Sequence, residues 1–315
     1  MTPLVSVLIP AYNCADFIDS SVSSVLSQSL SQFELIVVND GSTDGTGDRL
    51  RAYQDPRMRV ITQPNGEVAS ALNAAIGAAQ GTYLAFLDAD DIWLPTKLER
   101  HIRVHEERPD IDATFSWVDV INRRSEPVRM PCPRWRGTVS FDQLLADFMI
   151  RTMSAVVIER RAAVDAGLFR DGYCLDIEFF LRVALLRPDN ILAIPEVLTL
   201  YRRHAGQRTG DWRRMREGWT EMLGSVRELA SDKKAVAALG SSNMHRYFAS
   251  VAYENGDFHE ALRLIRRSFA LSPAAFVRDR RNWLMSAAAL AGFILPGRLL
   301  FALERSAGFD RPESG

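Results

Sequence analysis

The chain has 315 residues, of which 47% are hydrophobic and 24% are charged, and its 38 basic and 39 acidic residues leave a formal net charge of −1. This composition is typical of one large or two smaller globular domains and excludes a disordered chain. The near-neutral balance removes any general argument for nucleic-acid binding.

The first ninety residues alternate short apolar runs with segments of helical periodicity. The predicted strands cover residues 4–10, 33–39, 59–62 and 83–87, and the predicted helices between them cover 17–26, 43–53 and 67–79. Strand–helix units of this length connect by right-handed crossovers. The pattern therefore predicts an α/β fold with a mostly parallel sheet.

The pattern continues less regularly after residue 95. We expect helices at 97–107 and 177–186, strands at 113–120, 155–158 and 197–201, and a loop at 129–137, which is rich in proline and arginine. From about Gly206 the pattern is helical only. We therefore expect a domain at 1–205 and a helical extension at 206–315.

Within the extension, residues 247–273 resemble one tetratricopeptide-type helix pair. The resemblance depends on the small residues Ala252 and Ala261, the turn at 255–257 and the terminal Pro273. A single pair cannot bury its own faces, so we expect it to pack on its neighbours.

The membrane and redox signals are weak. The three cysteines, Cys14, Cys132 and Cys174, are far apart and lack metal-ligand spacing, which is typical of a reduced cytoplasmic protein. The start of the chain lacks the features of a signal peptide, and no apolar run is long enough to cross a bilayer. We therefore expect a cytoplasmic protein.

Polar residues follow three of the predicted strands, where parallel α/β sheets bind ligands. The first strand is followed by Tyr12 and Asn13, the second by Asp40, and the fourth by the acidic cluster at 88–91. The sequence therefore predicts a binding site at one edge of the sheet.

The acidic cluster contains three carboxylates within four residues, Asp88, Asp90 and Asp91. They repel one another unless a cation lies among them, and hard oxygen ligands suit Mg²⁺ or Mn²⁺. Such a cation can bridge a diphosphate and offset the charge of a leaving group. The alternative, a solvated turn that caps the next helix, is disfavoured by the apolar runs on both sides.

Asp40 lies in a glycine-rich turn and could accept hydrogen bonds from a nucleobase or ribose, although such residues also favour simple turns. The glycines Gly41, Gly45 and Gly47 do not have the spacing of a dinucleotide fingerprint, and a phosphate-loop lysine signature is absent. Hydride transfer and nucleotide hydrolysis are therefore disfavoured.

Together these motifs resemble the family 2 glycosyltransferases over the N-terminal two-thirds of the chain. The matching segments are PAYN (10–13), FELIVVNDGSTDGT (33–46), PNGEVASALNAAIGAAQGTYLAFLDADDIWLPTKLE (64–99), LDIEFFLR (175–182) and YRRH (201–204). The resemblance implies a GT-A, Rossmann-like domain that binds a nucleotide sugar. It also implies an inverting transfer of sugar that uses a divalent cation, Mn²⁺ or Mg²⁺. We expect a UDP-sugar donor, a saccharide or lipid-linked acceptor and a role in surface polysaccharide synthesis.

The resemblance also implies roles for individual residues. Asp90 would ligate the cation, His204 would lie close to the diphosphate or the metal, and Asp176 would be the general base. The expected donor-binding residues are Pro10, Tyr12, Asn13, Asp40, Asn73, Asp88 and Ala89. Three positions depart from the family pattern: Asn39 replaces a commoner aspartate, Leu72 an arginine before Asn73, and Leu175 a glutamate before Asp176.

Several of these residues also have simpler interpretations. An inverting transfer needs one base to deprotonate the acceptor, and Asp176, just before the predicted helix at 177–186, could be kept ionised by its N-terminus. It could instead only cap that helix, and His204 could be a structural hydrogen bonder. Trp93 and Trp117 could stack on a sugar, but core packing is favoured, and nothing marks Cys14 or Cys174 as a nucleophile.

Residues 283–295 form an apolar segment preceded by Arg278, Arg280 and Arg281. It is too short to cross a bilayer, so it either contacts the inner face of an anionic membrane peripherally or packs on the helix pair.

Two other functions compete with glycosyl transfer. A sugar nucleotidyltransferase would carry a glycine-rich basic loop after the first strand, where this chain has 10-PAYN-13. A degenerate nucleotide-sugar-binding or scaffold protein would not need Asp88, Asp90 and Asp176 together.

Overall fold

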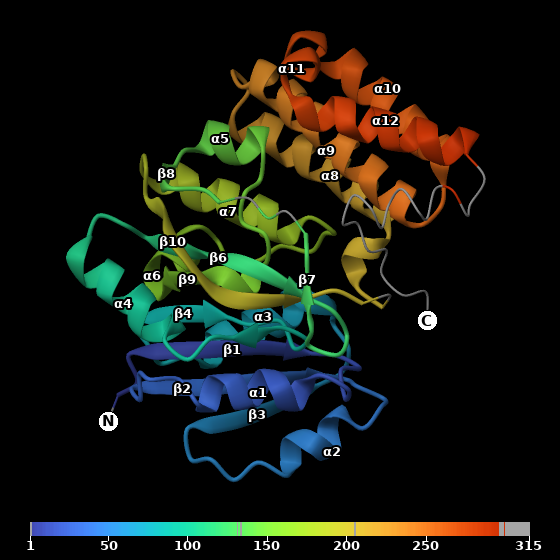
Figure 1. Ribbon diagram of the computed structural model, residues 1–315. Coiled ribbons are helices and arrows are strands. Elements are labelled where there is room, and N and C mark those ends of the chain that lie inside the picture. Colours follow the sequence, from blue (N-terminus) through green and yellow to red (C-terminus); the bar gives the residue numbers. More distant parts are fainter. Residues whose placement is uncertain (1, 131, 133, 205, 296–298, 300–315) are drawn as a thin grey trace.

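The computed structural model describes residues 2–130, 132, 134–204, 206–295 and 299. A twisted sheet forms the N-terminal part, and five helices gather at one end of the molecule, beside α5 and α7 (Figure 1). The strands are β1 (Val5–Ala11), β2 (Phe33–Asp40), β3 (Met58–Gln63), β4 (Tyr83–Phe86), β5 (Ile92–Trp93), β6 (Ala113–Ile121), β7 (Pro127–Val128), β8 (Gly137–Val139), β9 (Val156–Glu159) and β10 (Ile191–Arg202).

The helices of the N-terminal part are α1 (Ile18–Leu26), α2 (Thr46–Arg51), α3 (Glu67–Ala78), α4 (Lys97–Glu107), α5 (Phe141–Ala146), α6 (Arg160–Asp165) and α7 (Leu175–Leu186). The strand order is β3-β2-β1-β4-β9-β6-β10-β5, with β7 paired to β6 and β8 to β10. The pairs β3–β2, β2–β1, β1–β4 and β6–β10 are parallel. The predicted α/β fold with a mostly parallel sheet is confirmed.

The alternation of side chains along β1 explains how the sheet is covered. Val7 and Ile9 point into a core that includes α1 and α4, while Leu8 points into the core on the opposite face, where α3 packs. Both faces are therefore buried, as in other sheets built from crossover units.

The expected strand at 197–201 is much longer in the structure. β10 starts at Ile191, and its pairing with β6 shifts register between Ile194 and Thr199. Pro195 lies at this irregularity, and its missing N–H makes the segment look like a strand boundary in the sequence. The expected helix at 177–186 likewise begins earlier, so Asp176 lies in the first turn of α7 and not before it.

The C-terminal helices are α8 (Trp212–Leu229), α9 (Lys234–Glu254), α10 (Phe258–Leu271), α11 (Pro273–Arg278) and α12 (Arg280–Ile294). The helix pair expected at 247–273 is the end of α9 together with α10. Ala252 and Ala261 are fully buried between helices, and Gly256 has a φ of +78° in the turn that joins them. Within the described ranges, no helix is both long and apolar enough to cross a membrane.

The larger hydrophobic core joins the two parts of the chain. It contains Phe180 of α7, Trp219 of α8 and Phe248 of α9. A half-buried ion pair between Arg203 Nη2 and Glu254 Oε2, 2.8 Å apart, ties the residue after β10 to α9. The helical part thus packs on the sheet-containing part. The domain boundary at residue 205 stays a prediction. Residues 300–315 of the expected extension lie outside the described residues.

Candidate functional site

A cleft of about 850 Å³ opens at the carboxyl ends of β1, β2 and β4. Loops after these strands form one wall, and α7, the end of β10 and helices α8 and α9 form the others. The cleft is lined by nine of the sequence-predicted site residues, Pro10, Tyr12, Asn13, Asp40, Asp88, Ala89, Asp90, Asp176 and His204. Residues that are far apart in the sequence therefore meet where the strand ends predicted a site.

The turn after β1 is held by the loop after β2. Asn13 has a φ of +48°, and its Oδ1 accepts a hydrogen bond of 2.8 Å from the backbone N–H of Thr43. The Asn13 N–H donates to Ser42 Oγ at 3.1 Å. Tyr12, in contrast, is 52% exposed at the mouth of the cleft. The turn is thus fixed, while the Tyr12 ring is available to a ligand.

Asp40 is 3% exposed at the end of β2. Its Oδ1 accepts hydrogen bonds from Gln63 Nε2 at 2.7 Å and from the Gly66 N–H at 3.0 Å. These contacts fix the carboxylate against the β3–α3 loop. Asn39, the departure from the family pattern, accepts a hydrogen bond from the Ser42 N–H at 3.2 Å, so it shapes the same turn.

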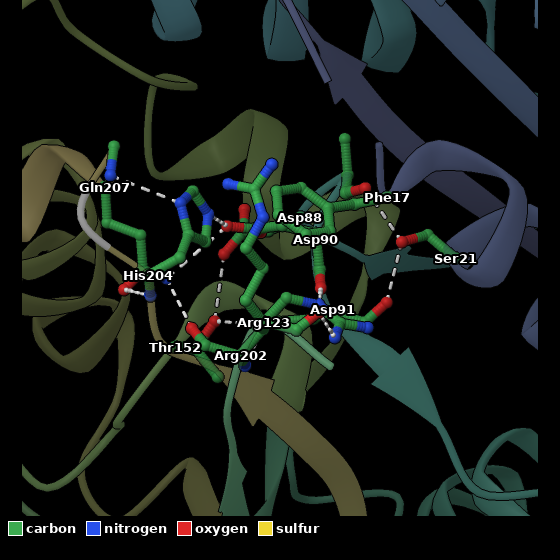
Figure 2. Close-up of polar contacts among 12 residues, drawn as sticks. Phe17, Ser21, Asp88, Asp90, Asp91, Arg123, Thr152, Arg202, His204 and Gln207 are labelled. Atoms are coloured by element: carbon green, nitrogen blue, oxygen red, sulfur yellow. Dashed lines mark hydrogen bonds and ion pairs between the residues drawn. The ribbon is translucent and has the colours of Figure 1, made fainter. Parts of the chain in front are cut away.

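The acidic cluster divides into residues with different surroundings. Asp91 is fully buried, and its Oδ1 accepts a 2.8 Å hydrogen bond from the Arg202 N–H, while Arg202 Nε donates to the Asp90 carbonyl at 2.6 Å (Figure 2). Burial, with Asp90 and Asp88 nearby, raises the pKa of Asp91 well above its ordinary value. Asp91 therefore anchors the turn to β10 and faces no ligand.

Asp88 lies half-buried beside Thr152. Its backbone N–H donates to Ser154 Oγ at 2.9 Å, and Thr152 Oγ1 lies 2.9 Å from its Oδ2. Burial and the neighbouring Asp90 raise the pKa of Asp88 to about 7. Two carboxylates this close favour a bound cation or proton between them.

Asp90 contacts His204 across the cleft. The imidazole Nε2 lies 3.0 Å from Asp90 Oδ2, and Gln207 Nε2 lies 3.4 Å from the same oxygen (Figure 2). The His204 ring also packs on Phe17, with 4.7 Å between ring centres. The two sequence-predicted metal residues are thus brought together.

Asp176 faces the same cleft from the first turn of α7. Its Oδ1 accepts a 2.9 Å hydrogen bond from the Ile177 N–H. Burial raises its pKa, while the N–H contacts and the nearby Arg208 partly oppose that rise. Its charge in turn raises the pKa of Asp88, so the two carboxylates are neighbours. Leu175, where the family carries glutamate, is 7% exposed in the core.

Asn73 is the exception among the predicted residues. It does not line the cleft, because its amide is used elsewhere: Nδ2 donates to the Phe169 carbonyl at 2.8 Å, and Oδ1 accepts from the Phe169 N–H at 3.0 Å. This geometry gives a donor contact no support. Asn73 instead fixes the loop that leads to Asp176.

Two tryptophans and two cysteines that the sequence left open as site residues have structural roles. Trp93 is 2% exposed and donates from Nε1 to the Ser154 carbonyl at 2.8 Å, and Trp117 donates to the Trp135 carbonyl at 2.7 Å. Neither ring lines the cleft. Burial raises the pKa of Cys14 to about 12 and raises that of Cys174, so neither thiol is an activated nucleophile.

Several residues around the cleft were not predicted. Thr152 and Ser154 support Asp88, and Gln207 contacts Asp90. Arg202 was visible within the YRRH segment, but its role in holding the acidic turn was not. No sequence motif predicted the part of the cleft formed by α5, α9 and Arg281, because only tertiary packing brings these segments together.

Two curated relatives match this chain over different shares of its length. The chain is 31% identical over 192 residues to "UDP-Glc:alpha-D-GlcNAc-diphosphoundecaprenol beta-1,3-glucosyltransferase WfgD" of Escherichia coli. This match covers 61% of this chain and 73% of that protein. It is 48% identical over 109 residues to "Putative teichuronic acid biosynthesis glycosyltransferase TuaG" of Bacillus subtilis. That match covers 34% of this chain and 43% of TuaG, so the chain aligns with less than half of this relative.

Two solved structures share the fold. TarS 1–349 of S. aureus, solved with UDP-GlcNAc, has a TM-score of 0.65 at 16% identity and covers 92% of this chain and 91% of its own. The mannosyltransferase PcManGT of Pyrobaculum calidifontis, solved with GDP-Man and Mn²⁺, has a TM-score of 0.61 at 16% identity, covering 97% and 88%. These neighbours confirm the GT-A fold.

The family assignment follows from the sequence. The family model described as "Glycosyl transferase family 2" matches residues 6–173, which include β1, the loop after β2, the acidic cluster and the loop before α7. With the relatives above, this match shows that the chain belongs to the family 2 glycosyltransferases and is a glycosyltransferase.

Proposed function

We propose that this glycosyltransferase performs a metal-dependent, inverting transfer from a UDP-sugar to a hydroxyl group of a saccharide or lipid-linked acceptor in surface polysaccharide synthesis. The observation that carries the proposal is the convergence of Asp90, His204 and Asp176 on one cleft at the carboxyl ends of the strands. Relatives named for polysaccharide assembly and for a UDP-glucose donor support the substrate class.

The residues at the acidic end of the cleft suit a hard divalent cation. Asp90 and His204 offer an oxygen and an imidazole nitrogen 3.0 Å apart, and Asp88 lies close by. Among the described residues no three carboxylate, imidazole or thiol groups converge on one point. Mn²⁺ and Mg²⁺ sites of this kind draw their remaining ligands from substrate phosphates and water. When bound, the cation supplies positive charge that stabilises the leaving diphosphate.

Asp176 is the proposed base. A buried carboxylate with a raised pKa accepts a proton more readily than an exposed one, and the Ile177 N–H keeps it oriented. It lines the same cleft as Asp88, and among the described residues no hydrogen bond joins it to Asp90 or His204, so it can face an acceptor while the donor is held. A single such base is what an inverting transfer needs.

The donor nucleotide occupies the part of the cleft formed by β1 and β2 in this proposal. Asp40 offers the free oxygen Oδ2 for a base or ribose, and Tyr12 and Asn13 border the same space. Pro10 and Ala89 complete the lining.

An exposed apolar face on α12 supports peripheral membrane contact at the cytoplasmic side. Ala289 and Gly292 pack inward, whereas Trp283, Leu290 and Ile294 share the outer face and are 55%, 49% and 64% exposed. Exposed Arg278 and Arg280 lie just before this face and favour an anionic surface. We expect flotation with anionic liposomes that weakens with salt and is lost on Ile294→Gln, but not on Val164→Gln, an exposed valine of α6.

The activity test uses the full chain with Mn²⁺ and a panel of nucleotide sugars. We expect the wild type to release nucleoside diphosphate from one UDP-sugar, and to do so faster when acceptor is present. The Asp176→Asn variant should not catalyse this release. Release of pyrophosphate from a nucleoside triphosphate and a sugar phosphate would instead indicate the nucleotidyltransferase alternative. Nucleotide binding without any turnover across acceptors would favour a degenerate binding protein.

A further inference from the structure

The cleft continues past Asp176 into a second half, which is built by the segment 145–153, helix α9 and the start of α12. Asn243 Nδ2 donates to the Ala146 carbonyl at 2.8 Å and holds these elements together. Among the described lining residues of this half, the guanidinium groups of Arg151, Arg246 and Arg281 outnumber the carboxylate of Asp147. This half is therefore basic, opposite in sign to the end that holds Asp88 and Asp90.

Arg246 forms no hydrogen bond or ion pair among the residues that the structure describes. Its Nε is buried without a hydrogen bond. The two nearest carboxylates are already used, because Arg281 Nη2 lies 2.7 Å from Asp147 Oδ2 and 2.8 Å from Asp279 Oδ2. Burial and the neighbouring Arg281 lower the pKa of Arg246. The carboxylates of Asp147 and Asp279 partly oppose this shift in pKa. Arg246 thus lines the cleft without an ion pair of its own among the described residues.

Arg151, in the segment after α5, lines the same half of the cleft. Its Nε is also buried without a hydrogen bond among the described residues. Its remaining contacts are weak: Nη2 lies 3.7 Å from Met130 Sδ, and the guanidinium carbon lies 5.9 Å from the centre of the Tyr201 ring. No carboxylate in the described ranges forms an ion pair with it.

A buried guanidinium N–H without a hydrogen bond is costly, and such groups are rare enough in folded proteins to indicate a partner that binds there. Guanidinium groups bind phosphate and carboxylate oxygens with paired hydrogen bonds. The donor diphosphate belongs at the acidic end of the cleft, where a cation can bridge it, so it does not account for Arg246.

We infer that Arg246 and Arg151 bind an anionic group of the acceptor, a phosphate or a carboxylate, on the side of Asp176 away from the donor. This inference rests on the proposed function for its assignment of the two halves. It narrows the acceptor from any saccharide to one that carries a negative charge, either on a phosphorylated carrier or on an acidic sugar.

The test is calorimetric titration of the full chain with three probes, geranyl diphosphate, inorganic pyrophosphate and glucuronate, in the presence of EDTA. The chelator removes metal-bridged binding at the donor end. We expect at least one probe to bind the wild type, and Arg246→Gln and Arg151→Gln to weaken it about tenfold, equivalent to about 1.4 kcal/mol. Binding of both diphosphates indicates a phosphate group, geranyl diphosphate alone indicates a lipid carrier, and glucuronate indicates an acidic sugar.

The matched control is Arg161→Gln. The Arg161 side chain is 88% exposed on α6, so this variant should bind the probe as the wild type does. The thermal midpoint of Arg246→Gln should be no lower than that of the wild type, because the substitution breaks no hydrogen bond or ion pair among the described residues. The probe should raise the midpoints of the wild type and Arg161→Gln more than that of Arg246→Gln. Arg246→Lys keeps the charge and should bind at an intermediate level.

Absence of binding for all three probes, or equal binding by the wild type, Arg246→Gln and Arg151→Gln, would overturn the inference. UDP titration with Mn²⁺ on the same proteins separates this failure from a failure of the proposed function. If the wild type does not bind UDP, the proposed donor site is contradicted. If the wild type binds UDP and Arg246→Gln does not, Arg246 belongs to the donor half and the acceptor assignment is contradicted.

Discussion

His204 and Asp90, 114 residues apart in the sequence, are joined by a 3.0 Å contact between Nε2 and Oδ2 at the end of the cleft. Neighbouring Arg202 holds the Asp90 carbonyl and the Asp91 carboxylate, so the end of β10 and the acidic turn are fixed together. The geometry of this pair is therefore set by the fold and does not depend on a flexible loop.

Asp90→Asn keeps the shape of the side chain but removes a charge. We expect turnover to fall about 100-fold or more with the fold intact, since even the partners of metal ligands contribute about 10- to 100-fold. His204→Gln should cost about tenfold, and excess Mn²⁺ should partly rescue it. The measurement is the rate of nucleoside diphosphate release against Mn²⁺ concentration, and rates equal to the wild type at every concentration would remove both residues from the metal site.

Asp176→Asn should separate the acceptor chemistry from donor binding. We expect transfer to be abolished while the affinity for UDP with Mn²⁺ stays nearly unchanged, because the base contacts the acceptor. If this variant kept most of its transfer rate, the helix-capping interpretation of Asp176 would be the better one.

The pH dependence follows from the raised pKa of Asp176. The base must be ionised, so the rate should fall as pH falls through that raised pKa, above the range of an ordinary aspartate. A carboxyl group whose pKa is raised in the folded chain binds protons more tightly there than in the unfolded chain. Its ionisation therefore lowers the free energy of unfolding at pH values above the raised pKa. This effect fades as the pH falls toward about 3.9, the ordinary pKa of aspartate. Asp176→Asn should therefore be more stable than the wild type at pH 7, with a difference that shrinks in acid; urea unfolding at several pH values measures it.

Asp40→Ala should weaken UDP binding about tenfold, because a charged hydrogen-bond acceptor is lost. Asp48→Ala is the matched control, since the Asp48 side chain is 79% exposed on α2 and lies outside the cleft. Titration of UDP with Mn²⁺ gives both affinities. Equal affinity for Asp40→Ala and the wild type would place the nucleotide elsewhere.

Two glycine substitutions test the packing of the helical part. A Cβ on Gly240 of α9 would overlap the carbonyl oxygen of Leu145, so Gly240→Ala should destabilise the protein by about 1–3 kcal/mol. Gly224 of α8 has open space around it, so Gly224→Ala should stabilise by about 0.5–1 kcal/mol. Thermal or urea unfolding compares them, and a Gly240→Ala protein as stable as Gly224→Ala would contradict the close approach of α9 to α5.

The acidic end of the cleft could be predicted because its residues follow apolar strands directly. Asp40, Asp88 and Asp90 occupy strand ends, and the sheet brings strand ends together whatever the loops do. Asn73 was expected only from the family resemblance, and a residue type alone does not reveal that the backbone of Phe169 already uses its amide.

The basic half of the cleft could not be predicted from the sequence. Arg151 and Arg246 belong to no motif, and they line one cleft only because α9 packs against the end of α5, where Asn243 contacts Ala146, 97 positions away. Likewise, Arg246 forms no ion pair in the described part of the chain because Arg281 holds both nearby carboxylates, and this depends on side-chain geometry.

The central claim is that Asp90 and His204 hold a divalent cation that binds the donor diphosphate. The most direct measurement is calorimetric titration of UDP into the wild type with Mn²⁺ and then with EDTA, repeated on Asp90→Asn. The account predicts binding with Mn²⁺ that is lost both in EDTA and in Asp90→Asn. Equal UDP affinity in Mn²⁺ and in EDTA would contradict it.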